Sequence, residues 1–313
     1  MINASAVTLV EVGPRDGFQS VATFIPVGTK IGLITKLHAA GLRRMEVTSF
    51  VSTTTLPQLA DAAEVLAAAQ TLPGLDAQVL VPTLRYAERA LAAGARHIAF
   101  VISVSEAHNR KNVRRNPMES VAEYERIAAI MPVGVKMRLN LATAFDCPFD
   151  GKVDMAATLG LLDEVAGMVP SAEICLCDTT GRVTPDHVRA LFSLALARFP
   201  AVCAWAFHAH DTYGLGVTNS LAAYERGVAV LDASFAGLGG CPFAPGATGN
   251  VATEDLVWMF ERMGVATGID QQLLLAATLE GGALPGASIG GRVRDALSAA
   301  RYAQSRSEAC IPS

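Results

Sequence analysis

The chain has 313 residues, a hydrophobic fraction of 51% and a formal net charge of −4 at pH 7. This mild acidity, without aromatic residues spaced along a basic face, argues against a nucleic-acid partner. Charged residues interrupt the apolar runs before they reach the roughly 20 residues of a membrane span, so we expect no membrane partner. The first six residues lack a signal-peptide pattern, which makes the cytoplasm the expected location.

Short apolar runs alternate regularly with longer amphipathic runs, as expected when strands and helices follow each other along a chain. The predicted strands cover residues 7–12, 44–50, 77–82, 97–103, 135–141, 173–178, 204–210 and 230–235. The predicted helices cover residues 29–40, 57–71, 85–93, 118–130, 155–169, 185–198, 218–226 and 253–263.

Eight consecutive strand and helix units in about 250 residues predict an α/β fold, a closed (β/α)8 TIM barrel with right-handed crossovers. An open doubly wound sheet is less favoured, because no G-x-G-x-x-G follows the first strand. We expect a single TIM-barrel domain over residues 1–313. Its barrel would span about 5–267, and extra C-terminal helices would lie in an extension over 268–313.

Polar clusters follow several predicted strands. They lie at residues 13–17, at 208–211 and in the Gly- and Pro-rich stretch 237–250. In a TIM barrel the carboxyl ends of all strands meet at one mouth, so these clusters are predicted to converge despite their separation in sequence. We interpret them as an active site.

The strongest candidate metal ligands are His208 and His210, which are spaced by two residues and therefore face the same side of a strand. Asp16 supplies a carboxylate and Asn250 an amide oxygen, which completes a reasonable set of protein ligands for a divalent cation. The alternative is that both histidines are hydrogen-bonded core residues and that Asp16 is a turn residue. Oxygen-rich ligation without a thiolate favours Mg2+ or Mn2+ over structural zinc.

Arg15 stands beside Asp16 and offers a fixed guanidinium that can stabilise a developing oxyanion. Its alternative role is an ordinary surface ion pair. Glu46 and Asp178 fall near predicted strand ends, where each would orient Arg15 or a metal ligand, or would cap a turn.

Cys241 is the candidate catalytic thiol, because it lies in the Gly- and Pro-rich stretch and has a reference pKa of roughly 8.5, near neutrality. A small apolar packing role is the alternative. The six cysteines form no C-x-x-C pair and are expected to be free thiols. Cys175 and Cys177 share one face of an apolar strand and are predicted to be core residues.

A basic cluster follows the fourth predicted strand, close to the expected mouth. It contains Arg110, Lys111, Arg114 and Arg115. Guanidinium and ammonium groups bind phosphates, so Lys111 and the adjacent Asn112 are candidate contacts for a nucleotide-tailed substrate. The alternative is a solvated surface without a ligand.

Five motifs resemble the 3-hydroxy-3-methylglutaryl-CoA (HMG-CoA) lyase family of the DRE-TIM metallolyase superfamily. They are EVGPRDG at 11–17, EVTSFVS at 46–52, HAHDTYG at 208–214, AGLGGCPF at 236–243 and GNVATED at 249–255. The resemblance runs from about Val7 to Gly268. It implies a TIM barrel that binds a divalent cation, with the ligands Asp16, His208, His210 and Asn250.

The resemblance also implies a reaction, the retro-Claisen cleavage of a 3-hydroxyacyl-CoA. Asp16 or His208 would take the hydroxyl proton, Arg15 would stabilise the resulting enolate and Cys241 would help to protonate it. The implied products are acetyl-CoA and acetoacetate, which connects the family with leucine degradation and ketone body metabolism. We also expect a homo-oligomer, because barrels with apolar extra helices often associate.

Other functions remain open at the level of sequence. Ser20, Val21 and Asp146 depart from the family pattern and leave a lyase for a methylmalyl- or citramalyl-type CoA ester as the nearest alternative. A Claisen-condensing synthase is less favoured, because such enzymes resemble longer chains with extra C-terminal regions. A non-catalytic barrel is a further alternative, because a fold does not prove turnover.

Overall fold

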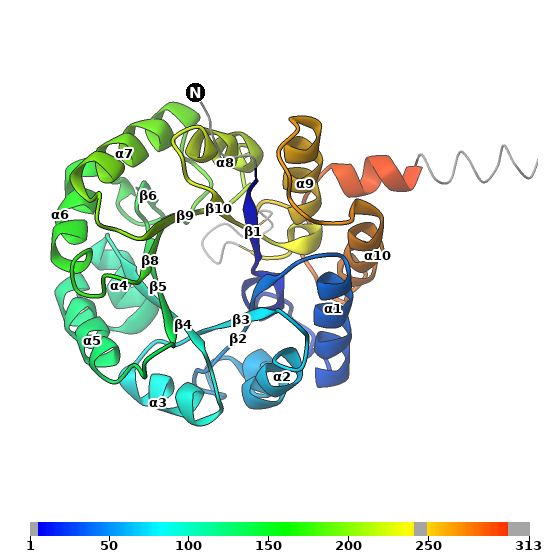
Figure 1. Ribbon diagram of the computed structural model, residues 1–313, viewed down its shortest axis with the longest axis horizontal. Helices are drawn as coiled ribbons and strands as arrows, with labels where there is room; N and C mark the ends of the chain where they lie inside the picture. Colours follow the sequence, from blue (N-terminus) through cyan, green and yellow to red (C-terminus); the bar gives the residue numbers. More distant parts are fainter. Residues whose placement is uncertain (1–5, 241–248, 300–313) are drawn as a thin grey trace, which may run out of the picture.

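The computed structural model of the chain describes residues 6–240 and 249–299. Within them, eight parallel strands close into a barrel in the order β1-β10-β9-β8-β5-β4-β3-β2. Figure 1 shows the helices as an outer ring around these strands. The barrel strands are β1 (Thr8–Glu11), β2 (Arg44–Ser49), β3 (Asp76–Leu80), β4 (His97–Ser103), β5 (Lys136–Ala142), β8 (Glu173–Asp178), β9 (Ala204–Ala209) and β10 (Val230–Ala233).

The predicted TIM barrel is therefore confirmed, and each predicted strand occurs as a barrel strand. Each predicted helix has a counterpart in the outer ring, in the same order along the chain. These counterparts are α1 (Val27–Ala39), α2 (Ala62–Ala69), α3 (Leu84–Ala92), α5 (Pro117–Ala129), α6 (Met155–Val165), α7 (Pro185–Arg198), α8 (Gly216–Tyr224) and α9 (Thr253–Arg262). A further helix, α10 (Gln271–Gly282), packs against α1 (Figure 1). The single-domain division over 1–313 stays a prediction.

The predicted helix over 57–71 is wrong in its first turn. A short 3-10 helix, η2 (Pro57–Leu59), comes first, and α2 begins only after Asp61. The ammonium group of Lys30 accounts for this break, because it donates to the Gln58 carbonyl and to the Asp61 carboxylate. Lys30 is itself buried, so these partners compensate its charge.

Two elements near the mouth were not predicted. The helix α4 (Glu106–Val113) follows β4, and its N-cap Ser105 accepts a hydrogen bond from the His108 backbone. A two-stranded hairpin, β6 (Asp146–Cys147) with β7 (Gly151–Lys152), follows β5. Each was missed because a short insertion carries little periodicity of its own.

The core lies between the strands and the helix ring. Helix α1 contributes Leu33 and Leu37, and α7 contributes Leu191 and Phe192, all fully buried. Burying side chains of this size contributes roughly 1.5–3 kcal/mol each. In the part of the chain that the structure describes, no helix combines the length and the apolar character that crossing a bilayer requires.

Candidate metal centre at the barrel mouth

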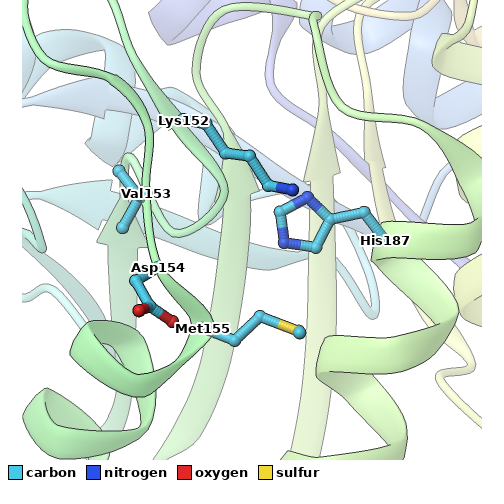
Figure 2. Close-up of a pocket in the computed structure, with 5 residues that line it drawn as sticks. All are labelled: Lys152, Val153, Asp154, Met155 and His187. Atoms are coloured by element: carbon cyan, nitrogen blue, oxygen red, sulfur yellow. The ribbon is translucent and has the colours of Figure 1, made fainter.

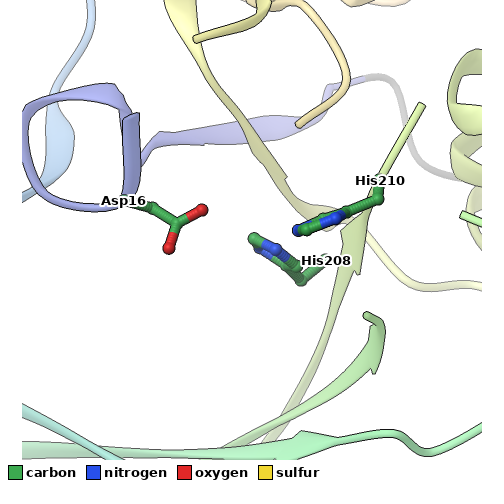
Figure 3. Close-up of side chains that lie close together, drawn as sticks. All are labelled: Asp16, His208 and His210. Carbon is green, nitrogen blue, oxygen red and sulfur yellow. The ribbon is translucent and has the colours of Figure 1, made fainter. Parts of the chain in front are cut away.

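Three side chains from distant parts of the chain meet at the carboxyl ends of the strands. One ligand atom from each of Asp16, His208 and His210 lies within 4.8 Å of the others. Figure 3 shows the Asp16 carboxylate facing the two imidazole rings, whose centroids are 5.2 Å apart. The structure thus brings together the three residues that the sequence predicted as charged or imidazole ligands.

Asp16 is positioned by a tight turn directly after β1. The turn η1 (Gly13–Gly17) is a π-helical turn in which the backbone amides of Arg15 and Asp16 both donate to the Val12 carbonyl. A side chain at Gly13 would lie only 2.5 Å from the Phe235 ring. Glycine is therefore required here for β1 to turn its polar residues into the mouth.

Asn250 joins the same cluster from the other end of the chain. Its Nδ2 atom donates to Asp16 Oδ2 at 2.8 Å and to the Leu238 carbonyl at 3.1 Å. The backbones of Gly239 and Gly249 approach so closely that a Cβ on Gly249 would lie 2.4 Å from Gly239. These glycines allow the two ends of the Gly-rich stretch to meet, which holds Asn250 against Asp16.

The donor set fits a divalent cation. Besides the clustered carboxylate and imidazoles, two buried atoms have no hydrogen-bond partner among the described residues, namely His210 Nδ1 and Asn250 Oδ1. Buried polar atoms are normally satisfied, and both of these carry a lone pair that a cation can use. A set of carboxylate, amide and imidazole ligands of this kind suits a divalent metal ion.

Arg15 lies between two carboxylates. Its Nε atom donates to Glu46 Oε1, and its Nη1 atom donates to Asp16 Oδ1 at 2.5 Å. Burial alone would raise the pKa of Asp16, but Arg15 and the two histidines outweigh burial and lower this pKa to about 2. Asp16 is therefore ionised at neutral pH, as a metal ligand must be.

The two histidines have opposite electrostatic environments. Burial lowers the pKa of His208, but the hydrogen bond to Asp232 and nearby negative groups outweigh it and raise this pKa to about 9. Burial and the neighbouring His208 lower the pKa of His210 to about 4. Without a cation, His208 thus holds a proton at neutral pH that metal binding must release, whereas His210 is already neutral.

Asp178 makes the turn-capping contacts that the sequence left as an alternative. Its Oδ1 atom accepts a hydrogen bond from the Gly181 backbone at 2.9 Å, and the amides of Thr180 and Val183 also donate to this carboxylate. Burial raises the pKa of Asp178 to about 7. Its contacts thus differ from those of Glu46, which binds Arg15 directly.

The remaining predicted residues lie outside the metal cluster or outside the described residues. Lys111 and Asn112 are exposed on α4, which follows β4 at the barrel mouth. Cys241 lies outside the described residues. Cys175 and Cys177 are buried on β8, which confirms their predicted place in the core.

A pocket of about 350 Å³ opens beside the hairpin, where α6 and α7 begin. Figure 2 shows the Lys152 side chain pointing toward the His187 ring across this pocket. Asp146 connects the hairpin to the loop after β8, because it accepts a hydrogen bond from Thr180 at 2.8 Å and pairs with Arg182 at 3.4 Å. Asp146, one of the departures from the family pattern, thus connects the hairpin after β5 to the loop after β8.

The sequence analysis missed Gln19 and Asp232, which contact predicted site residues, and Arg138, which contacts Asp232. Gln19 donates to Asp16 at 3.0 Å, and Asp232 lies 3.0 Å from His208 and also accepts from Arg138. The sequence carried a signal for both: Asp232 is a charged residue inside the otherwise apolar β10, and Arg138 stands between the apolar residues Met137 and Leu139 of β5. An inward-facing charge in a barrel strand needs a partner, so each of these residues indicates a polar contact inside the barrel.

Behind the site, Glu254 supports the short 3-10 helix η3 (Phe235–Gly237) that follows β10. Its Oε2 atom accepts a hydrogen bond from the amide of Ala236, a residue with a left-handed φ of 57°. Its Oε1 atom is buried without a partner among the described residues. Burial is the main reason that the pKa of Glu254 is raised from 4.5 to about 8.

This raised pKa predicts a pH-dependent stability. Folded protein keeps the Glu254 proton up to about pH 8, whereas unfolded chain loses it near 4.5, so stability falls as pH rises between these values. In Glu254→Gln, we expect the free energy of unfolding to fall less steeply with pH than in wild type, with the two slopes differing by about 1 kcal/mol per pH unit. Urea unfolding at pH 5.5, 6.5 and 7.5 measures this difference. Exposed Glu64→Gln is the control, and parallel curves for wild type and Glu254→Gln would contradict the prediction.

The fold and the site together define a class, the TIM-barrel proteins with a candidate divalent-metal centre at the mouth of the barrel. Within this class, the HMGL-like family model matches residues 6–279. The chain belongs to the HMGL-like family.

Several known proteins that are similar to this chain are named HMG-CoA lyases. Mitochondrial hydroxymethylglutaryl-CoA lyase of Bos taurus is 42% identical over 272 residues, which cover 87% of this chain and 83% of the relative. The HMG-CoA lyase structure from Bacillus subtilis has a TM-score of 0.90 and 35% identity, covering 95% of this chain and 100% of the other. An HMG-CoA lyase from Acinetobacter baumannii, in complex with coenzyme A and 3-methylmalate, has a TM-score of 0.86 and 36% identity, covering 95% and 96%.

Proposed function

We infer that this protein is a divalent-metal-dependent lyase that cleaves HMG-CoA into acetyl-CoA and acetoacetate. The observation that carries this proposal is the convergence of Asp16, His208 and His210 at the mouth, with Arg15 against Asp16. The similarity to named HMG-CoA lyases over 87% of the chain supports the substrate.

Asp16, His208, His210 and Asn250 would hold the cation, for which Mg2+ and Mn2+ are the proposed ions. When bound, such an ion supplies Lewis-acid polarisation of hydroxyl and carbonyl oxygens. The protein residues determine where the substrate oxygens can lie, because the three clustered side chains are directed toward one another (Figure 3).

Cleavage begins with removal of the proton from the C3 hydroxyl of the substrate. The ionised Asp16 carboxylate is one candidate base, and His208, after it has released its own proton, is the other, since both lie in the cluster. The electron pair of the O–H bond forms the C3 carbonyl while the C2–C3 bond breaks. The electrons of that bond move to C2 and the thioester carbonyl, which gives acetoacetate and the enolate of acetyl-CoA.

Arg15 stabilises the thioester enolate in this proposal. The contacts to Glu46 and Asp16 fix its guanidinium before the reaction, so no reorganisation is needed as negative charge develops. A proton delivered to C2 then completes acetyl-CoA. We assign this protonation to Cys241, on the resemblance of the Gly- and Pro-rich stretch to that of the lyases.

Lys111 and Asn112 remain the proposed contacts for the CoA tail, and their exposure on α4 near the mouth supports this assignment. The complex of a related lyase with coenzyme A also supports an acyl-CoA partner. A cytoplasmic location, a homo-oligomeric state and a role in leucine degradation or ketone body metabolism stay predictions.

One specific observation favours a second substrate class. The similar lyase from Acinetobacter baumannii was crystallised with 3-methylmalate, a methyl-substituted hydroxy diacid. Together with the departures at Ser20, Val21 and Asp146, this supports methylmalyl- or citramalyl-type CoA esters as alternative substrates.

A panel of acyl-CoA esters tests the function. We expect release of acetyl-CoA and acetoacetate from HMG-CoA by the purified protein, complete loss of activity with a chelator, and recovery with added Mg2+ or Mn2+. Faster cleavage of a methylmalyl- or citramalyl-type ester than of HMG-CoA would favour the alternative substrate. Full activity after exhaustive chelation, verified by metal analysis, would contradict the metal dependence.

A further inference from the structure

The interior of this barrel is unusually charged. TIM-barrel interiors are filled mainly with branched apolar side chains, but here a continuous chain of hydrogen bonds and ion pairs runs through the barrel. It connects, in order, Asp16, Arg15, Glu46, Gln78, Arg44, Glu173, Arg138, Asp232 and His208. Both ends of this chain are members of the candidate metal cluster.

The charges in this chain favour a cation at its open ends. Its four carboxylates are Asp16, Glu46, Glu173 and Asp232, and its three guanidinium groups are Arg15, Arg44 and Arg138. Once His208 has released its proton, as cation binding requires, the sum is three positive and four negative charges, or a net charge of −1. Because the groups are largely buried, water screens this residual charge only weakly.

His208 is held from one side by Asp232. These residues are register partners on the neighbouring strands β9 and β10, so their side chains project to the same face of the sheet. His208 Nδ1 lies 3.0 Å from Asp232 Oδ2. A carboxylate only accepts, so Nδ1 carries the hydrogen, and in a neutral ring the lone pair is then on Nε2.

Asp232 is in turn held by Arg138. The Nη2 atom of Arg138 donates to the same Asp232 oxygen at 2.6 Å, its Nη1 atom lies 3.1 Å from Glu173, and its Nε atom donates to Asn140 at 2.8 Å. The Arg138 side chain is only 1% exposed. With three contacts in a packed interior, the guanidinium has no room to rotate, so it fixes the carboxylate that orients the ring.

We propose that Asp232, fixed by Arg138, is the positioning residue that keeps the Nε2 atom of His208 directed at the cation site. The proposal rests on the proposed function and deepens it, because neither residue touches the reacting atoms. Partners that orient a ligating histidine in this way typically change metal affinity by 10–100-fold when they are mutated.

The barrel contains a matched control for this pair. At the opposite, amino-terminal end of the strands, His97 Nδ1 lies 3.0 Å from Asp76 Oδ1, and Asp76 also accepts from the cation Lys136. His97 is buried, as His208 largely is. Asp76→Asn therefore weakens an equivalent buried histidine–carboxylate pair without touching the candidate metal cluster.

The experiment compares Mn2+ binding, by isothermal titration calorimetry, for wild type, Asp232→Asn and Asp76→Asn. We expect the Kd of Asp232→Asn to rise about 10–100-fold, with near-wild-type circular dichroism, and that of Asp76→Asn to stay within about two-fold. In the cleavage assay, we expect Asp232→Asn to lower kcat more than it raises KM at saturating Mn2+, because the ring and not the substrate is displaced.

Two results would overturn the proposal, namely unchanged Mn2+ affinity in Asp232→Asn or an equal loss in Asp76→Asn. If Asp232→Asn does not fold, Arg138→Lys replaces it under the same criteria, since lysine keeps the charge but lacks the planar guanidinium whose three nitrogens contact Asp232, Glu173 and Asn140. HMG-CoA cleavage by the wild type tests the proposed function, whereas the difference in Mn2+ affinity between variants tests Asp232, so the two failures are distinguishable.

Discussion

Replacing Asp16 by asparagine is expected to abolish detectable cation binding and nearly all lyase activity. The substitution keeps the shape of the side chain but removes the negative charge that faces both histidines (Figure 3). It also leaves the guanidinium of Arg15 with only one of its two carboxylate partners. Loss of a residue that only orients a metal ligand typically raises the Kd by 10–100-fold, and we expect a larger rise in the Kd for Mn2+ here. We expect kcat/KM to fall at least ~10³-fold.

Calorimetry with Mn2+ and the acetyl-CoA release assay measure these two effects for Asp16→Asn. Asp163→Asn is a suitable control, because Asp163 pairs with Arg198 on the exposed surface and contributes little. An Asp16→Asn protein that binds Mn2+ as tightly as wild type would show that the cluster in Figure 3 is not the cation site. The proposed chemistry would then lose its basis.

The second large effect is expected from Arg15→Gln. Loss of a fixed charge that stabilises a developing oxyanion typically lowers kcat by about 10²–10³-fold. The Kd for Mn2+ should stay near the wild-type value, because a guanidinium has no lone pair to donate. Arg15→Lys should not restore activity, because lysine has a single nitrogen and lacks the planar guanidinium that contacts Glu46 through Nε and Asp16 through Nη1.

Single-turnover kinetics separate the cleavage step from product release and therefore measure the effect of Arg15→Gln on chemistry. Arg89→Gln, on the exposed face of α3, controls for the loss of a positive charge. A kcat within a few-fold of wild type for Arg15→Gln would mean that Arg15 is only a structural partner of Glu46.

The two variants separate functions that the geometry places side by side. Asp16 and Arg15 are consecutive residues on one turn, yet one is expected to determine cation affinity and the other the rate of the chemical step. Both depend on η1, whose amides bond to Val12 and whose Gly13 allows close packing against Phe235. Because Phe235 follows β10, this part of the mouth is assembled from the segments that follow the first and the last barrel strands.

Much of this protein is determined by sequence alone. Short apolar runs that alternate with longer amphipathic runs predict all eight barrel strands. Each strand is buried on both faces, one toward the barrel interior and one toward the helix ring, and therefore has an apolar sequence. The spacing of His208 and His210 places both rings on one face, and the polar residues after strands 1 and 7 predict a shared mouth. These features depend on local periodicity and on a general rule of the fold, so they are readable without coordinates.

The tertiary structure alone decided which partners the polar residues have. Glu46 and Asp178 look equivalent in sequence, as carboxylates near strand ends, yet one binds Arg15 and the other caps its own turn. The pairing of Asp232 with His208 and Arg138 depends on strand register around the closed barrel. Register and side-chain packing arise from long-range contacts that leave no local period, so sequence periodicity predicts where strands lie but not which buried charges meet.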